Sequence, residues 1–446
     1  MSFIQDVFSG IEKSLINGAV SGVISATKGP SGDIQPGDIQ IESITLMSED
    51  KQRKYNLMNQ CVGIDIFESI TSPVIFAELS ISDAIGLYQS FPIIGEEYVA
   101  ITFRTPGSPT SAKYLFRTNK ITDKEVKSNN LMVTYKIQLV SPEMMRNAGR
   151  YLFRPYKKNI HDIVTDIIKE DLQTEKPVSI DSTSGIEEGI ITRMEPFKAI
   201  DFLRRRAVSA EFKSSSYVFY ESRDGFVFTT LERLITKGQK SIDSGKNDKT
   251  FFLDTTRNQN INDVAIRNIL AYNQMSFADT ISKAQEGGIS NNVKSYDMIT
   301  GKVKSIDYKD DGRAGFATMD QNGAATNTAG FIRKHSQATS VQRLVPISSA
   351  LPSSTRPEKV SYLTAFTQNV TQNIVRILIY GDSEIRIGDM IKCTLPASLT
   401  ADDAGLSRLE TGNYLVTKVR HMIINTDRPQ HTISLELIKG NFTETI

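Results

Sequence analysis

One block of strand-forming sequence occurs twice in this chain of 446 residues, near its opposite ends. Residues 94–103 read IGEEYVAITF, and residues 387–395 read IGDMIKCTL, which is one residue shorter. Further on, residues 120–140 align without a gap on residues 418–438. Both copies alternate apolar and polar side chains, and this period of two indicates strands with one buried face. The repeat predicts two β-domains of one design at the two ends of the chain.

Strand patterns fill residues 39–145, which we interpret as a first small β-barrel domain. The expected strands are residues 39–47, 62–69, 75–82, 97–105, 114–121 and 131–140. The second copy of the block predicts a second barrel from residues 251–308 and 370–446. The predicted fold class is therefore α+β and β-rich, with two homologous small barrels and an insert between them.

The segment between the two β-domains has a different character. Residues 159–172 and 197–210 carry helical patterns, the second beginning after Pro196. Residues 217–221 and 226–230 are expected to form a hairpin that turns at Arg223-Asp224-Gly225. We assign residues 146–250 to an α+β insert domain.

Two segments lie outside these domains. Residues 1–38 are expected to form a helix and a linker rich in Gly and Pro; the helix either docks on a partner, packs on its own domain or is disordered. Residues 309–369 show little periodic pattern and are expected to be a long extended or inserted segment.

Composition excludes several classes of function. Lys and Arg number 52 against 51 Asp and Glu, so the formal net charge is +1 and no global field recruits nucleic acid or a membrane. No signal peptide is visible, and no apolar run reaches the roughly 18 residues that a membrane-spanning helix needs, so no membrane insertion is expected.

The chain lacks the motifs of catalytic and metal sites. A GxSxG elbow, an HExxH helix and a phosphate-binding glycine loop are all missing. The cysteines Cys61 and Cys393 have no CxxC neighbour and are interpreted as core residues. His421 and His431 share a predicted hairpin and are interpreted as ordinary strand residues. We therefore expect no catalytic, cofactor-binding or metal-ligating residues, no cofactor and no enzyme activity.

Other polar and aromatic groups are interpreted as structural. They are His161, the run Arg204-Arg205-Arg206, the pairs Glu96-Glu97 and Glu187-Glu188, the glycines Gly287-Gly288, and the turn Asp310-Asp311-Gly312. A carbohydrate- or oligonucleotide-binding groove would need exposed aromatic residues. Tyr98, Phe103 and Tyr114 are the candidates for such a groove, and packing in the core or between subunits is the competing interpretation.

The order of these parts resembles a known family, the central hub subunit of contractile-tail baseplates in bacteriophages, whose relatives include the hub portion of secretion-system spike proteins. The resemblance covers residues 39–438. It is carried by the first β-domain, by YLFRPYKKNIHDIVTDII, by PFKAIDFLRRRAVSAEFKSSSYVFYESRDGFVFTTLERL, and by the closing strands IRIGDMIKCTLP and NYLVTKVRHMI. Nothing is carried over to residues 1–38 or 309–354.

The resemblance implies a homotrimer in which each subunit gives two homologous tube-type barrels to a pseudo-sixfold ring. Such a ring matches a sixfold tail tube on one side and a threefold spike on the other. The implied partners are tail tube or tube-initiator proteins, the central spike protein and the tape-measure protein, while DNA passes through the channel without specific binding. The implied location is the tail baseplate of the virion, assembled in the host cytoplasm.

Two further functions remain as alternatives. One is the hub of a related contractile injection or secretion device, and the other is a tail-associated hydrolase. Whether Arg104, Arg117 or Lys392 faces the channel is left open by the sequence.

Overall fold

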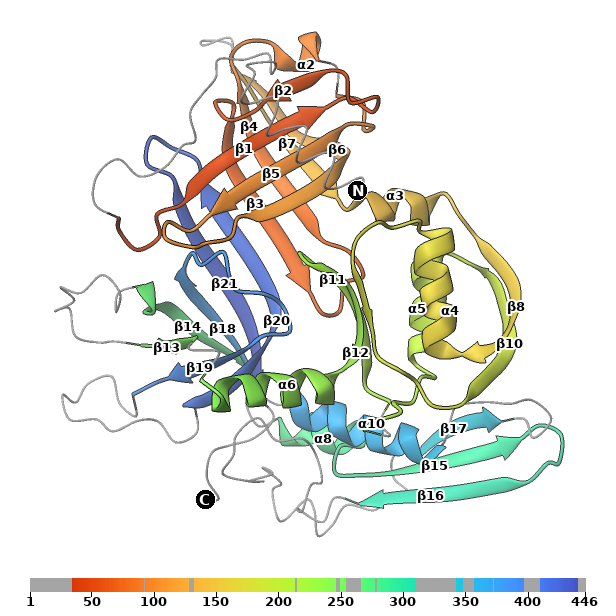
Figure 1. Cartoon of the computed structure of the whole chain (residues 1–446). Helices are drawn as coiled ribbons and strands as arrows, with labels where there is room; N and C mark the ends of the chain where they lie inside the picture. The colour runs from red at the N-terminus through yellow and green to blue at the C-terminus, as the bar shows by residue number, and fades with distance from the viewer. Residues whose placement is uncertain are drawn as a thin grey trace.

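The computed structural model describes residues 34–91, 93–127, 132–212, 215–245, 249–253, 266–276, 279–309, 342–347, 357–371, 373–396 and 410–439. A 13-stranded sheet forms the centre of the molecule, and an α+β insert and a small separate sheet lie beside it (Figure 1). The helix expected before residue 28 lies outside the described residues, as do residues 310–341 of the long segment and the turn at Asp310.

The first half of the large sheet contains every strand that was expected before residue 141. Its elements are β1 (Gln40–Met47), β2 (Lys54–Asn56), β3 (Cys61–Ser69), β4 (Phe76–Asp83), the short helix α2 (Leu87–Ser90), β5 (Tyr98–Arg104), β6 (Ala112–Lys127) and β7 (Met132–Val140). The alternating apolar residues of these strands build one buried cluster, with Ile64, Leu79 and Ile137 each at most 1% exposed. The period of two therefore predicted both the strands and their buried face.

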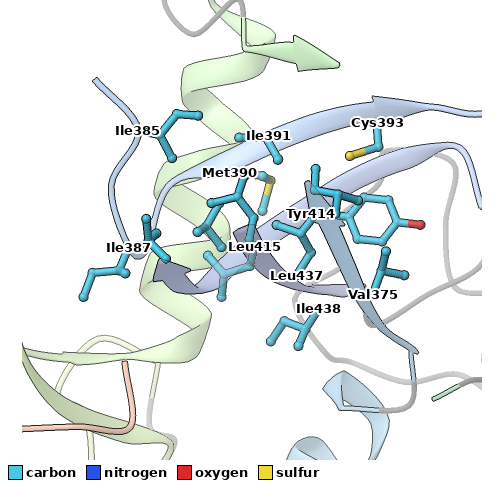
Figure 2. Close-up of a cluster of buried hydrophobic side chains, with 14 of the residues drawn as sticks. Val375, Ile385, Ile387, Met390, Ile391, Cys393, Tyr414, Leu415, Leu437 and Ile438 are labelled. Atoms are coloured by element: carbon cyan, nitrogen blue, oxygen red, sulfur yellow. The ribbon is translucent and has the colours of Figure 1, made fainter. Parts of the chain in front are cut away.

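The second half of the sheet comes from both sides of the long segment. Its strands are β13 (Thr250–Phe252), β14 (Ile269–Ser276), β18 (Asn373–Tyr380), β19 (Met390–Thr394), β20 (Gly412–Ile424) and β21 (Gln430–Lys439). Figure 2 shows its core, where Met390 lies between the strands and α6 (Leu231–Asp243). A Cβ on Gly238 of α6 would lie 2.6 Å from the Met390 Cβ, so this glycine lets the helix approach the strand closely.

The two halves join into one open sheet, which differs from the two closed barrels that the sequence predicted. The strand order is β14-β18-β21-β20-β3-β4-β7-β6-β5-β1-β2, and β13 and β19 branch off beside β20. The physical reason lies in strand length. β20 has 13 residues and β19 only five, so half of β20 extends past β19 and β3 pairs with its free edge.

The insert has its own core between the halves. Its elements are α3 (Pro142–Ala148), β8 (Leu152–Asn159), α4 (Ile160–Asp166), the π-helical turn η1 (Ile167–Asp171), β9 (Val178–Ile180), β10 (Ile186–Met194), α5 (Pro196–Arg204), β11 (Tyr217–Ser222) and β12 (Gly225–Thr230). The hairpin of β11 and β12 lies where the sequence predicted it. The helix expected over residues 197–210 ends earlier, at Arg204.

A separate three-stranded sheet follows the insert along the chain. It contains β15 (Ser290–Asp297), β16 (Val303–Lys309) and β17 (Gln342–Ile347), with the helices α8 (Thr280–Gln285) and α10 (Pro357–Val370) nearby. Buried Ser361 of α10 donates its hydroxyl to the Asn291 side chain at 2.6 Å, which ties the helix to β15. Residues 251–308, which were expected to supply one barrel, thus divide between two sheets.

Candidate assembly surfaces

The two halves of the large sheet have the same internal order. In the first half the order is β3-β4-β7-β6-β5-β1, and in the second it is β14-β18-β21-β20-β19-β13. The sixth strands of the two halves differ in direction, because β1 is antiparallel to β5 whereas β13 is parallel to β19. The repeat read from the sequence is thus part of a longer equivalence of five strands and an altered sixth.

The closing hairpins of the halves pair in the same register. In β6–β7 the pairs include Arg117↔Val140, Thr118↔Leu139, Lys120↔Gln138 and Ile121↔Ile137. In β20–β21 they include Leu415↔Ile438, Val416↔Leu437, Lys418↔Glu436 and Val419↔Leu435. Both hairpins carry a bulge at the same place, after Thr118 and after Val416. The gap-free alignment therefore matches equivalent residues at 120–122 and 132–140, while a second bulge after Thr122, which β20 lacks, shifts the equivalence of residues 125–127 by one position.

The first two strands of each half also pair in the same register, although their amino-acid sequences show no repeat. In β3–β4 the first pairs are Cys61↔Ile81, Gly63↔Ser80 and Ile64↔Leu79. In β14–β18 they are Ile269↔Ile379, Ala271↔Leu378 and Tyr272↔Ile377. Each set contains a shift after its first pair, so even this irregularity is shared. Sequence comparison missed this pair because strand equivalence needs only alternation, which many sequences satisfy.

The turns before β5 and β19 repeat one hydrogen bond. The carbonyl of Glu97 accepts from the Thr118 amide at 2.9 Å, and the carbonyl of Asp389 accepts from the Val416 amide at 2.9 Å. Gly95 and Gly388 precede these residues with φ of +100° and +80°, a left-handed conformation that favours glycine. The IG dipeptide seen twice in the sequence thus marks one turn used twice.

The junction of the halves is a strand pair, β20 with β3. Its register runs from Lys418↔Ser69 to Ile424↔Gly63. Ile423 of β20 is 2% exposed and lies in the core cluster of the first half, beside Ile64 of β3. The second half thus contributes a side chain to the core of the first.

Two histidines lie buried near this junction. Nδ1 of His421 and Nε2 of His431 are 3.1 Å apart, and the Phe103 ring makes a T-shaped contact with each of the two rings. Burial lowers the pKa of His431 to about 3, and burial together with the neighbouring His431 holds the pKa of His421 well below its ordinary value. Both rings are therefore neutral at pH 7 and share one hydrogen bond.

One face of the central strands is exposed and carries ion pairs. The outward residues are those that alternate with the buried ones, and cross-strand partners share this face. The pairs are Arg420–Asp65 at 2.8 Å, Lys136–Glu78 at 3.0 Å, Lys136–Asp123 at 3.4 Å, Lys418–Glu436 at 2.8 Å and Arg376–Glu436 at 3.7 Å. The alternating sequence pattern predicts that these residues face outward. Their ion-pair partners follow only from the order of the strands in the sheet.

The residues considered as catalytic candidates have structural contacts. Cys61 and Cys393 are free and buried, and burial raises the pKa of Cys393 to about 12, which disfavours the reactive thiolate. Nδ1 of His161 is 3.0 Å from the Thr183 hydroxyl. Within the described residues, no group of three or more His, Cys, Asp or Glu side chains could hold a metal ion.

The arginine run and the pair Glu187-Glu188 form ion pairs within the insert, whereas Glu97 holds a turn of the first half. Arg204 and Arg205 both contact Asp201, and Arg206 lies over the Phe202 ring and 3.7 Å from buried Glu187. Glu188 contacts Lys157, and Glu97 accepts the backbone amides of Ile94 and Gly95. These contacts account for the charges without a nucleic acid or a sugar.

The aromatic candidates for a groove belong to the core and to its rim. Phe103 and Tyr114 are buried and stacked 6.0 Å apart, and the Tyr114 hydroxyl donates to buried Glu68 at 2.8 Å. Arg117 covers the Tyr98 ring at 4.3 Å. Arg104 pairs with Glu42 at 3.3 Å, and Lys392 is exposed on β19. None of the helices in the described ranges has the length and apolar character to cross a membrane.

Known structures share this arrangement over nearly its whole length. A tail protein of Neisseria meningitidis MC58 matches with a TM-score of 0.52 and 9% identity, covering 90% of this chain and 98% of that one. The 43 kDa tail protein of prophage MuSo2 from Shewanella oneidensis matches with a TM-score of 0.52 and 10% identity, again covering 90% and 98%. No protein-family model matches the chain, and no curated protein matches its sequence. The chain therefore has the fold of these two solved tail proteins, one of which comes from a prophage.

Proposed function

We propose that this chain is the structural hub of a contractile-tail baseplate in a bacteriophage, forming a homotrimeric, pseudo-sixfold ring. The observation that carries the proposal is the equivalence of the two halves, which agree in strand order, register and the position of a bulge. One chain with two equivalent units fills two of six positions, so three chains present six similar units. The shared fold of solved tail proteins supports a place in such a particle.

In this proposal the ring joins the tail tube, or its initiator protein, to the central spike. The sixfold tail tube would contact the six equivalent units, and the threefold spike would contact features that occur once per chain. The ring encloses the channel for tape-measure protein and DNA, in a baseplate assembled in the host cytoplasm. The role is structural and not enzymatic, and it needs no cofactor.

The test is the mass of the particle in solution. We expect light scattering to give about 149 kDa, three times the chain mass of 49.6 kDa, and electron microscopy to show rings with a central hole. Addition of the tube and spike proteins from the same particle should give a complex with one ring between them. A chain that stays monomeric alone and with both proteins would contradict the proposal.

A further inference from the structure

The junction inside the chain offers a template for contact between chains. β20 uses the residues beyond β19 to pair with β3, and Ile423 of β20 enters the core of the neighbouring half. By the shared register, β6 is the equivalent of β20 and β14 is the equivalent of β3. Each chain therefore carries a second copy of both partners of this junction.

Those second copies lie in different halves of the sheet, with β14 at one end and β6 between β7 and β5. β6 pairs with β5 through Arg117 and continues to Lys127 with only β7 beside it among the described strands. β14 has β18 on one side and no described strand on the other. The strand order separates β6 and β14 by six strands, so they do not meet within one chain. Exposed strand edges of this kind pair readily with another chain.

A side chain of β6 is exposed where its equivalent in β20 is buried by the internal junction. In the sheet, Val126 of β6 pairs with Val133, as Ile423 of β20 pairs with His431, so the two side chains are equivalent. Ile423 is 2% exposed and Val126 is 68% exposed. On the opposite strand, Tyr272 takes the place of Ile64 and borders the core of the second half. An exposed valine thus stands where the template buries an isoleucine.

We propose that the end of β6 in one copy pairs antiparallel with β14 of the next copy of this chain. The register follows from the pairs Met422↔Asp65, Ile423↔Ile64 and Ile424↔Gly63 of the internal junction. It places Glu125 opposite Asn273, Val126 opposite Tyr272 and Lys127 opposite Ala271. Val126 then enters the core of the neighbouring second half beside Tyr272. The inference rests on the proposed ring and names the contact that closes it.

Cysteine pairs test this register in the full chain. Glu125 and Asn273 are both exposed, and the equivalent residues Met422 and Asp65 face each other across the internal junction. The double variant E125C/N273C should form disulfide-linked dimers and trimers under mild oxidation, seen on a non-reducing gel. A mixture of the single variants E125C and N273C should give linked dimers. The native cysteines are buried and do not compete.

The control pairs E125C with M298C. Met298 is 66% exposed in the turn after β15, on a different sheet, so random collision would link this pair as well. Efficient linkage of E125C/N273C, with little linkage of the control, supports the strand pairing. A trimer by light scattering that does not cross-link overturns the pairing but leaves the proposed hub standing. A monomer that does not cross-link overturns both.

Discussion

His421 and His431 show how a single pair of side chains makes the junction sensitive to acid. Their shared hydrogen bond needs one proton between two facing nitrogens, so the neutral rings fit it. A second proton would leave a cation in the core beside Phe103. Gly381 makes room for this arrangement, because a Cβ there would lie 2.1 Å from the His431 ring.

We expect the histidine pair to destabilise the chain below pH 6.5. In the unfolded chain both rings take up a proton near pH 6.5, whereas burial lowers the pKa of His431 to about 3 and also lowers that of His421. The unfolded state therefore binds more protons, and the free energy of unfolding falls as the pH falls from about 6.5 towards the folded pKa. By pH 5 each histidine should cost about 2 kcal/mol.

Urea unfolding at pH 7.5 and pH 5 measures this effect. The double variant H421L/H431L should lose less stability on acidification than the parent chain. Glu68 acts in the opposite direction, because burial raises its pKa to about 7 and its contribution is lost as the pH rises through that value. Both proteins contain Glu68, so the difference between them isolates the histidines. Equal losses in the two proteins would contradict the assignment.

At the scale of elements, one buried trio attaches the insert to the large sheet. Lys176 contacts Glu143 of α3 at 2.7 Å and also contacts Glu221 of β11. Glu221 in turn accepts the backbone amide of Ile75 at 3.0 Å, just before β4. The two glutamates raise the pKa of Lys176 against the effect of burial, so the lysine stays charged.

Removing this lysine should loosen the insert. In K176M two buried carboxylates lose their counter-charge, and we expect a loss of about 3 kcal/mol in the free energy of unfolding, since breaking one side of a buried pair leaves the other uncompensated. The matched control is K157M, whose lysine is 65% exposed and pairs with Glu188. Its effect should stay below about 1 kcal/mol. Chemical denaturation measures both, and equal effects would count against the role of the trio.

Some of these elements could be predicted from the sequence and others could not. The strands of the first half were predictable because each buries one face and alternates accordingly. β8 and β10 were missed because they pair only with each other, and their burial does not alternate regularly. α6 was missed because it starts at Leu231 directly after β12, with Thr230 as both the last strand residue and the cap.

Long-range order was harder to predict than local structure. The alignment of the two hairpins matched equivalent residues at 120–122 and 132–140, but it predicted neither the bulge that the hairpins share nor the second bulge of β6. The sequence could not show that β3 would pair with β20, because strand partners far apart in the chain leave no periodic signal. For the same reason the ion pair of Arg420 with Asp65 could not be predicted.

At the scale of the whole molecule, the exposed face of the central strands is close to neutral. Glu436 contacts both Lys418 and Arg376, and Glu78 contacts Lys136. A cation held in this way has less to gain from a phosphate, because it must first leave its partner. If this face lines the channel of the proposed ring, DNA would slide past it with little attraction.

Removing the acidic partners of these basic side chains should give the chain a measurable affinity for DNA. We expect the parent chain to bind short duplex DNA weakly in fluorescence anisotropy, and E78Q/E436Q to bind at least about tenfold more tightly at low salt, with affinity that falls steeply as salt rises. The control E170Q/E188Q changes the net charge equally but removes partners of Arg154 and Lys157 on the insert. Equal binding by the two variants would show that net charge alone decides.

The direction of the sixth strand in each half has a consequence for the stoichiometry of binding. β1 is antiparallel to β5 and β13 is parallel to β19, although the strands inside them match. In the proposed ring, a protein that contacts only the matching strands finds six binding sites of nearly equal affinity. A protein that binds across β13 and β19 finds three binding sites per ring. A titration against accessory proteins should therefore saturate at either six or three copies per ring, and the number identifies which strands the accessory protein contacts.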